Sequence, residues 1–185
     1  MQSKRQFLPS SFKISSWDEL KPFFQELLDR RIESKEAFNG FLHNLSELES
    51  VVNEDVAWRY IKMTCDTTNK ELEASYIDFV TNIQPQIAPF EDQLNRKIYD
   101  SPFKSDLESE KAYFIYFRAI QNSIQLFREE NIELQAELQT LSQKYGNITG
   151  AYVCGDKRRN THFTTSIQSF KIDRSLASKT NLRNY

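Results

Sequence analysis

The chain has few of the residues that turn-rich or disulfide-bonded domains need. Its 185 residues include only four Gly and five Pro, which disfavours an all-β fold built on many turns. Cys65 and Cys154 are too few and too far apart for a disulfide framework, so we expect a cytoplasmic protein with free thiols. No apolar run has the length of a membrane span, and the start "MQSKRQFLPSSF" lacks the apolar stretch of a signal peptide, so we expect no membrane partner.

Catalytic motifs are also missing from the sequence. The only two histidines, His43 and His162, do not form an HExxH pair, which would place two zinc ligands on one helical face. Cys154 and His162 are two ligand types without a second pair, which is a very weak zinc signal. No Gly-rich phosphate loop, GxSxG elbow or CxxC occurs. We therefore predict no catalytic, cofactor-binding or metal-binding residues in this chain.

Charge is divided unevenly along the chain. Residues 151–185 carry seven Lys or Arg against two Asp, a net charge of +5. The remainder has 17 basic and 24 acidic residues, a net charge of −7. A basic tail on an acidic body can indicate nucleic-acid binding. Here the basic residues have no periodicity and no interleaved aromatic platforms, so we expect no nucleic-acid partner.

Apolar residues recur at helical spacing through the first half of the acidic body. Ser16 and Glu19 form a capping box before Trp17, Leu20, Phe24 and Leu27. A second helix begins near Ser34, and its apolar positions are Phe38, Phe41, Leu45, Leu48 and Val52. The run "NEDVAWRYIKMTCDTT" continues it, with Trp58, Ile61 and Cys65 on one stripe. We expect Trp58 in the core, because two apolar stripes indicate a helix packed on more than one side.

The second half of the body shows the same periodicity. Thr68 and Glu71 form a capping box, Pro85 and Pro89 are predicted to break the helix that follows, and "DSP" ends a short helix after Ile98. Ser105 and Glu108 cap the strongest helix. Its apolar positions are Tyr113, Phe117, Ile120, Ile124 and Phe127. A final stripe consists of Ile132, Leu138, Leu141 and Tyr145.

These patterns predict an all-α fold, an antiparallel helical array with short connections and an irregular or disordered C-terminal tail. We expect three regions. Residues 1–11 form a flexible N-terminus, residues 12–150 form the helical region, and residues 151–185 form the tail.

Several segments resemble one known family in order and spacing. They are "ISSWDELKPFFQELLDR", "LSELESVV", "AWRYIKMTCDTTNKE", "FVTNIQPQIAPFEDQLNRK", "DSPF", "QLFREENI" and "SQKYGNITGA". Over roughly residues 7 to 151 the chain resembles the amino-terminal region of oligoendopeptidase F-type zinc metallopeptidases, relatives of thimet oligopeptidase. The resemblance implies a mostly helical, cytoplasmic enzyme that cuts short peptides inside a deep channel.

The resemblance also implies where the chemistry of the family lies. Its HExxH zinc site and a further Glu ligand are far downstream of the matching region, so no catalytic residue is carried over to this sequence. The matching helices are expected to wall the substrate channel. We therefore interpret the chain as an inactive amino-terminal part of such an enzyme, with zinc and peptide substrate belonging to the full-length family. A stand-alone helical protein-interaction module is the alternative.

The tail departs from the family pattern after "NITGA". Members continue with segments resembling "MSVEI", "TLQQAS" and "LKSTDR", whereas this chain continues "YVCGDKRRNTHFTTSIQSFKIDRS". Codons for these residues, shifted by one nucleotide, permit several of the family segments in order. We therefore expect a frameshift near Ala151. A helical part without its partner region is also expected to self-associate through exposed apolar faces, such as the aromatic run from Tyr113 to Phe117.

Overall fold

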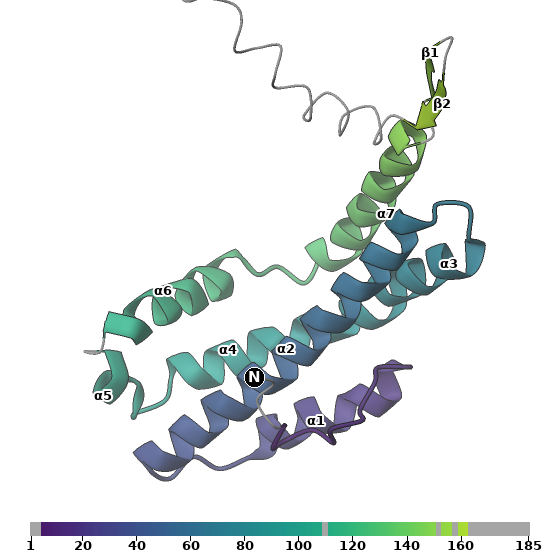
Figure 1. Cartoon of the computed structure of the whole chain (residues 1–185). Coiled ribbons are helices and arrows are strands. Elements are labelled where there is room, and N and C mark those ends of the chain that lie inside the picture. Colours follow the sequence, from purple (N-terminus) through teal and green to yellow (C-terminus); the bar gives the residue numbers. More distant parts are fainter. Residues whose placement is uncertain (1–4, 109–110, 151–152, 157–158, 163–185) are drawn as a thin grey trace, which may run out of the picture. The chain divides into compact units, whose positions relative to one another are not determined.

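A computed structural model describes residues 5–108, 111–150, 153–156 and 159–162. The chain divides into two compact units, Met1–Leu138 and Gln139–Tyr185. The all-α class is confirmed for the body, whose elements are helices (Figure 1). No helix among the described residues is long and apolar enough to cross a membrane.

The first two helices begin close to the predicted positions. Helix α1 spans Trp17–Asp29 and α2 spans Lys35–Cys65. The Ser34 side chain accepts the backbone N–H of Ala37, so this predicted cap is confirmed. The predicted capping box at α1 is wrong, because Ser16 makes no side-chain cap bond. Instead, the Ser15 hydroxyl donates to Glu19 at 2.6 Å.

Helix α3 (Lys70–Asp78) is capped by a different residue from the one predicted. The Asn69 side chain accepts the backbone N–H groups of Glu71 and Leu72, so the Thr68–Glu71 box does not form. The Thr68 hydroxyl donates instead to Asp66 at 2.7 Å. Asn is as good an N-cap as Thr, and here it lies directly before the first helical residue.

The predicted break at Pro85 and Pro89 does not occur. A π-helical turn, η1 (Phe79–Ile83), joins α3 to α4 (Gln84–Tyr99) without an interruption. Pro85 lies in the first turn of α4, where a missing N–H is tolerated, and Pro89 lies inside the helix. In the π turn the Gln84 N–H reaches back to the Phe79 carbonyl, which widens the backbone just before Pro85.

The helix predicted from Ser105 is described as two segments. Helix α5 spans Lys104–Glu108 and contains Ser105, α6 spans Lys111–Leu126, and residues 109 and 110 lie outside the described part. The predicted apolar face of α6 is confirmed, with Phe117 and Ile120 buried. Helix α7 spans Asn131–Gly150.

Two short strands lie where the sequence indicated irregular structure. Strands β1 (Val153–Asp156) and β2 (Arg159–His162) pair antiparallel, with Val153 opposite His162 and Asp156 opposite Arg159. The expected disorder of residues 163–185 lies outside the described residues.

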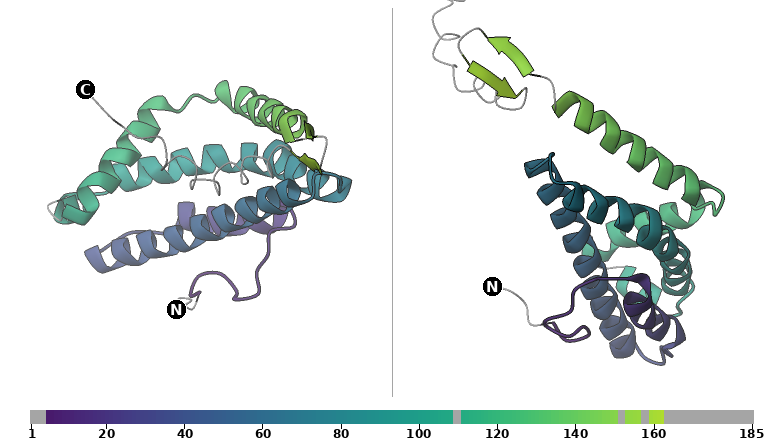
Figure 2. Two further views of the ribbon diagram at one scale, coloured as in Figure 1. Left: turned by 45° about the horizontal axis from the view of Figure 1, so that its top comes forward. Right: turned by 90° about the vertical axis from the view of Figure 1, so that its right-hand side faces the viewer.

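Helix α2 and the helical run from α3 to α4 lie side by side and antiparallel (Figures 1 and 2). The Arg59 guanidinium donates to the Ser75 backbone oxygen, and the Lys97 ammonium lies over the Phe41 ring. Later residues of α2 thus contact earlier residues of the α3–α4 run, as expected for antiparallel helices. Helix α1 packs against both α2 and α4, and α6 packs against α4. The largest fully buried side chains are Phe24, Phe38, Phe41, Phe79, Leu20, Leu27, Leu45, Leu48, Leu94, Ile98, Leu107 and Val80.

The prediction that Trp58 belongs to the core is wrong. Its side chain is 53% exposed, and Ile61 is 43% exposed. The covered position in this turn belongs to Arg59, which pairs with Asp55 at 2.6 Å and donates to the Ile14 carbonyl at 2.7 Å. The far end of α2 packs against α3, so its second apolar stripe stays in water.

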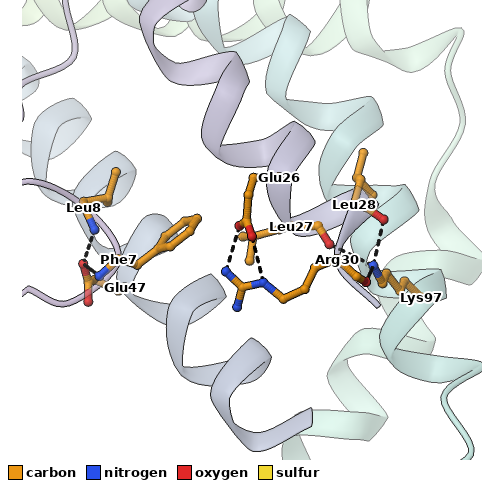
Figure 3. A network of polar contacts seen from close by, with 8 residues as sticks. All are labelled: Phe7, Leu8, Glu26, Leu27, Leu28, Arg30, Glu47 and Lys97. Carbon is orange, nitrogen blue, oxygen red and sulfur yellow. Dashed lines mark hydrogen bonds and ion pairs between the residues drawn. The ribbon is translucent and has the colours of Figure 1, made fainter. Parts of the chain in front are cut away.

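The N-terminal segment is attached to α2 rather than free. The Glu47 carboxylate accepts three successive backbone N–H groups, from Gln6, Phe7 and Leu8, at 2.8 to 3.0 Å. Figure 3 shows the bonds from Phe7 and Leu8. Leu8 is buried as a result. This arrangement differs from the flexible N-terminus expected for residues 1–11, of which residues 1–4 lie outside the described part.

A lysine from α4 completes the C-terminus of α1. The Lys97 ammonium donates to the carbonyls of Leu27 at 2.9 Å and Leu28 at 2.7 Å, and also to that of Arg30 (Figure 3). The last carbonyls of a helix have no partner within the helix, and they carry partial negative charge. Because an ammonium has three donors, one side chain satisfies all three acceptors. Burial lowers the pKa of Lys97.

We predict that Phe38→Ala lowers the free energy of unfolding by about 3–5 kcal/mol, because it leaves a cavity at a fully buried position. The matched variant Trp58→Ala removes an exposed ring and should cost less than about 1 kcal/mol. Urea unfolding followed by circular dichroism measures both. Equal losses for the two variants would contradict the packing described here.

We also predict that Lys97→Met lowers the free energy of unfolding by about 2–4 kcal/mol, because it keeps the aliphatic stem and leaves the α1 carbonyls without their charged donor. Lys70→Met serves as the control, since Lys70 pairs with Glu73 on the surface and should cost less than about 1 kcal/mol. A similar small loss at Lys97 would show that water replaces the ammonium without cost.

Candidate functional site

A surface groove of about 480 Å³ lies where α1, α4 and the start of α7 approach one another. Its walls combine two aromatic rings, two prolines, an isoleucine and charged residues. They are Trp17, Lys21, Pro85, Gln86, Pro89, Phe90, Glu129, Ile132 and Glu133. All of these residues belong to the first compact unit.

The aromatic wall of the groove is held in place by the core. The Trp17 ring meets Phe90 edge-on, with centroids 5.1 Å apart, and Phe24 lies 5.9 Å from Trp17. Phe24 is fully buried, while the two rings above it are partly exposed. Such edge-to-face contacts stabilise a defined orientation of each ring. The groove therefore presents a preformed apolar surface.

The prolines of the groove depend on the π turn. Pro85 follows η1 directly and Pro89 comes one helical turn later, so both rings lie on the same side of α4. Proline rings are rigid and lack an N–H, so this wall offers apolar surface without a competing donor. Aromatic and proline surfaces together suit apolar side chains of an extended ligand.

Charges of both signs border the groove. Lys21 comes from α1, and Glu129 and Glu133 come from the start of α7 and the turn before it. All three side chains are exposed. A ligand with an apolar body and separated positive and negative ends would complement this arrangement.

A second, more polar cavity of about 200 Å³ lies between α4 and α6. It is lined by Glu91, Asp92, Asn95, Arg128 and others. Asp92 is already paired with Arg96 at 2.7 Å. The Arg128 guanidinium donates to the backbone oxygens of Gln125 and Phe127, so it completes the end of α6. Asp92 and Arg128 thus have partners within their own helices or turns. The remaining charged residue of this cavity is Glu91.

Glu91 belongs to an acidic cluster on facing helices. Burial, together with the nearby Glu91 carboxylate, raises the pKa of Glu49 to about 7. Burial also raises the pKa of Glu91. On α6, burial and the Glu49 carboxylate raise the pKa of Tyr116. The cluster thus holds a carboxyl group that takes up a proton near neutral pH.

The cysteines and histidines lie on different elements, α2 and the two strands. His43 and Cys65 are exposed on α2. In the hairpin, Cys154 stands opposite Thr161 and not opposite His162. Among residues 5–108, 111–150, 153–156 and 159–162, no three His, Cys, Asp or Glu side chains come together as a metal site.

Comparison with known families decides the assignment of the body. The sequence model described as peptidase M3 N-terminal domain matches residues 7–127. The chain belongs to this family. No curated protein and no solved structure matches the chain significantly.

The match places the aromatic groove in the peptidase M3 N-terminal domain. Residues 7–127 include Trp17, Lys21, both prolines and Phe90, whereas Glu129 and Glu133 follow the matched range. No site residues were expected from the sequence, and the groove residues were not recognised there. The one signal for it was the pair Pro85 and Pro89, which was interpreted as a helix break.

The acidic cluster predicts a pH-dependent stability. The folded-state pKa of Glu49, about 7, lies above the ordinary value of 4.5, so ionising Glu49 opposes folding. Its contribution lowers stability as pH rises from about 4.5 to about 7. Glu49→Gln should therefore raise the free energy of unfolding by on the order of 1–3 kcal/mol at pH 8 and change it little at pH 4.

Urea unfolding of both proteins from pH 4 to pH 8 measures this effect. Glu130→Gln, at an exposed position in the turn before α7, is the matched control and should shift stability by less than about 0.5 kcal/mol at each pH. If Glu49→Gln is less stable than the original chain at pH 8, the ionised Glu49 carboxylate does not oppose folding.

Proposed function

We propose that this chain supplies the peptide-facing helices of an oligoendopeptidase F-type zinc metallopeptidase, and that it does not hydrolyse peptides by itself. The observation that carries the proposal is the preformed groove of Trp17, Pro85, Pro89 and Phe90 within the peptidase M3 N-terminal domain. The ordered segments that resemble the oligoendopeptidase F type support the finer assignment.

The groove has the chemistry to hold a short peptide. Its aromatic and proline walls bury apolar side chains, which gives affinity without strong sequence preference. Lys21 can pair with a peptide carboxylate, and Glu129 or Glu133 with an amino group. Because the groove has charges of both signs, it suits a peptide with an amino and a carboxylate group. A nucleic-acid site would instead have an excess of basic side chains.

Hydrolysis requires groups that this chain does not provide. In this family, as the resemblance implies, a zinc ion activates the attacking water. The sequence has no HExxH, and the described residues form no ligand set. The role proposed for this chain is therefore to bind and orient the peptide, in a cytoplasmic enzyme whose zinc-binding residues lie elsewhere.

Peptide binding can be measured through Trp17 itself. The chain has two tryptophans, so Trp58→Phe leaves Trp17, in the groove, as the only indole. Titration with a short apolar peptide that lacks Trp should change the Trp17 emission with saturation. Lys21→Glu should weaken binding about 2- to 5-fold, the range for one exposed ion pair. Lys70→Glu, on the exposed surface of α3, should leave binding unchanged.

A quenched peptide substrate tests the catalytic half of the proposal. We expect no turnover by the pure chain, with or without added zinc. Chelator-sensitive turnover would refute the inactivity, and the absence of any Trp17 response to peptides would refute the role of the groove.

A further inference from the structure

Helix α7 carries its large apolar side chains on an exposed face. Leu134, Leu138, Leu141, Tyr145 and Ile148 are each 59% to 69% exposed. These five residues, which we name the α7 stripe, follow one another at intervals of four, three, four and three. This is the spacing of the apolar seam of a coiled coil. The spacing of the stripe is a property of this helix alone.

The opposite face of α7 is more covered but largely polar. Ala136, Thr140, Gln143 and Asn147 are all less exposed than the stripe residues. An amphipathic helix of a globular domain normally has the reverse arrangement, with its apolar stripe toward the core. The stripe therefore has the form of an interface that a further helix covers.

We propose that the α7 stripe pairs with the α7 stripe of a second copy of this chain, as an antiparallel two-helix coiled coil. In this register Leu138 faces Leu141 of the second copy, and Leu134 faces Tyr145. Because the pairing is symmetric, each contact occurs twice. Four of the five stripe residues face one another, and Ile148 lies at the end of the pairing, opposite Asn131.

Charge complementarity selects both the second copy and the antiparallel direction. On a coiled coil, the residues flanking the seam face one another across the two helices. In the antiparallel register Glu137 lies beside Lys144 of the second copy, and Lys144 beside its Glu137. Both residues are exposed in the single chain. Two ion pairs therefore form, while the other flank opposes Gln135 and Ser142, which carry no charge.

A parallel pair of α7 helices would not bring Glu137 and Lys144 together. Its flanking contacts would place Glu137 beside Ser142 and Lys144 beside Thr149, and Tyr145 would face Tyr145. The sequence of α7 thus favours one orientation through its charges. This inference does not depend on the proposed peptide-binding role, because the groove residues lie outside the stripe.

A charge-swap series on the full chain tests the proposal. Sedimentation equilibrium should show a monomer–dimer equilibrium. Glu137→Lys, or Lys144→Glu, opposes like charges twice and should raise the dimer dissociation constant about 5- to 20-fold at low salt. The double variant Glu137→Lys/Lys144→Glu restores both ion pairs and should return the constant to within about 3-fold of the original.

Two further measurements make the test decisive. Leu138→Gln/Leu141→Gln should abolish the dimer while the helical circular dichroism of the body persists, because both side chains are exposed in the monomer. If the chain stays monomeric at all concentrations, the proposal is overturned. The stripe would then be covered by residues 163–185 or by another protein. A dimer that the charge series does not affect would also overturn it.

Discussion

The arrangement of the first helices depends on the ammonium group of Lys97. Helix α1 has no basic residue in its last turn, so its terminal carbonyls need a donor from elsewhere. Lys97, nearly 70 residues later in the chain, provides it from α4 and also lies over the Phe41 ring of α2. One side chain thus connects the end of α1 to two helices. The buried apolar contacts supply most of the stability, and this contact fixes where α1 ends.

The groove is a consequence of how the chain accommodates two prolines. A proline in a helix interior removes a hydrogen bond and crowds the preceding turn. Here the π turn η1 comes immediately before Pro85, and helicity continues through Pro89 to Tyr99. Both rings are then displayed beside Trp17 and Phe90. A feature that would end a helix elsewhere has become part of a preformed apolar surface, which is the surface proposed to hold peptides.

Two parts of the structure oppose the stability of the single chain. Glu49 is partly buried, and the Glu91 charge nearby disfavours its ionisation further. The α7 stripe leaves five large apolar side chains in water. Stability alone would favour a neutral residue at Glu49 and polar residues on α7. In the groove, by contrast, Trp17 packs on the buried Phe24, so this surface is compatible with a stable fold.

The sequence by itself determined the all-α class, the family resemblance, the Ser34 cap and the inner face of α6, because helical periodicity and local capping are encoded within a few residues. Tertiary structure decided which of the apolar faces are buried. Trp58 and Arg59 are neighbours on α2, yet the arginine is covered and the indole is exposed, because only Arg59 can reach Asp55 and the Ile14 carbonyl. The groove likewise joins residues from α1, α4 and α7 that no local pattern brings together. Local patterns specify which faces can be buried, and only packing selects which faces are.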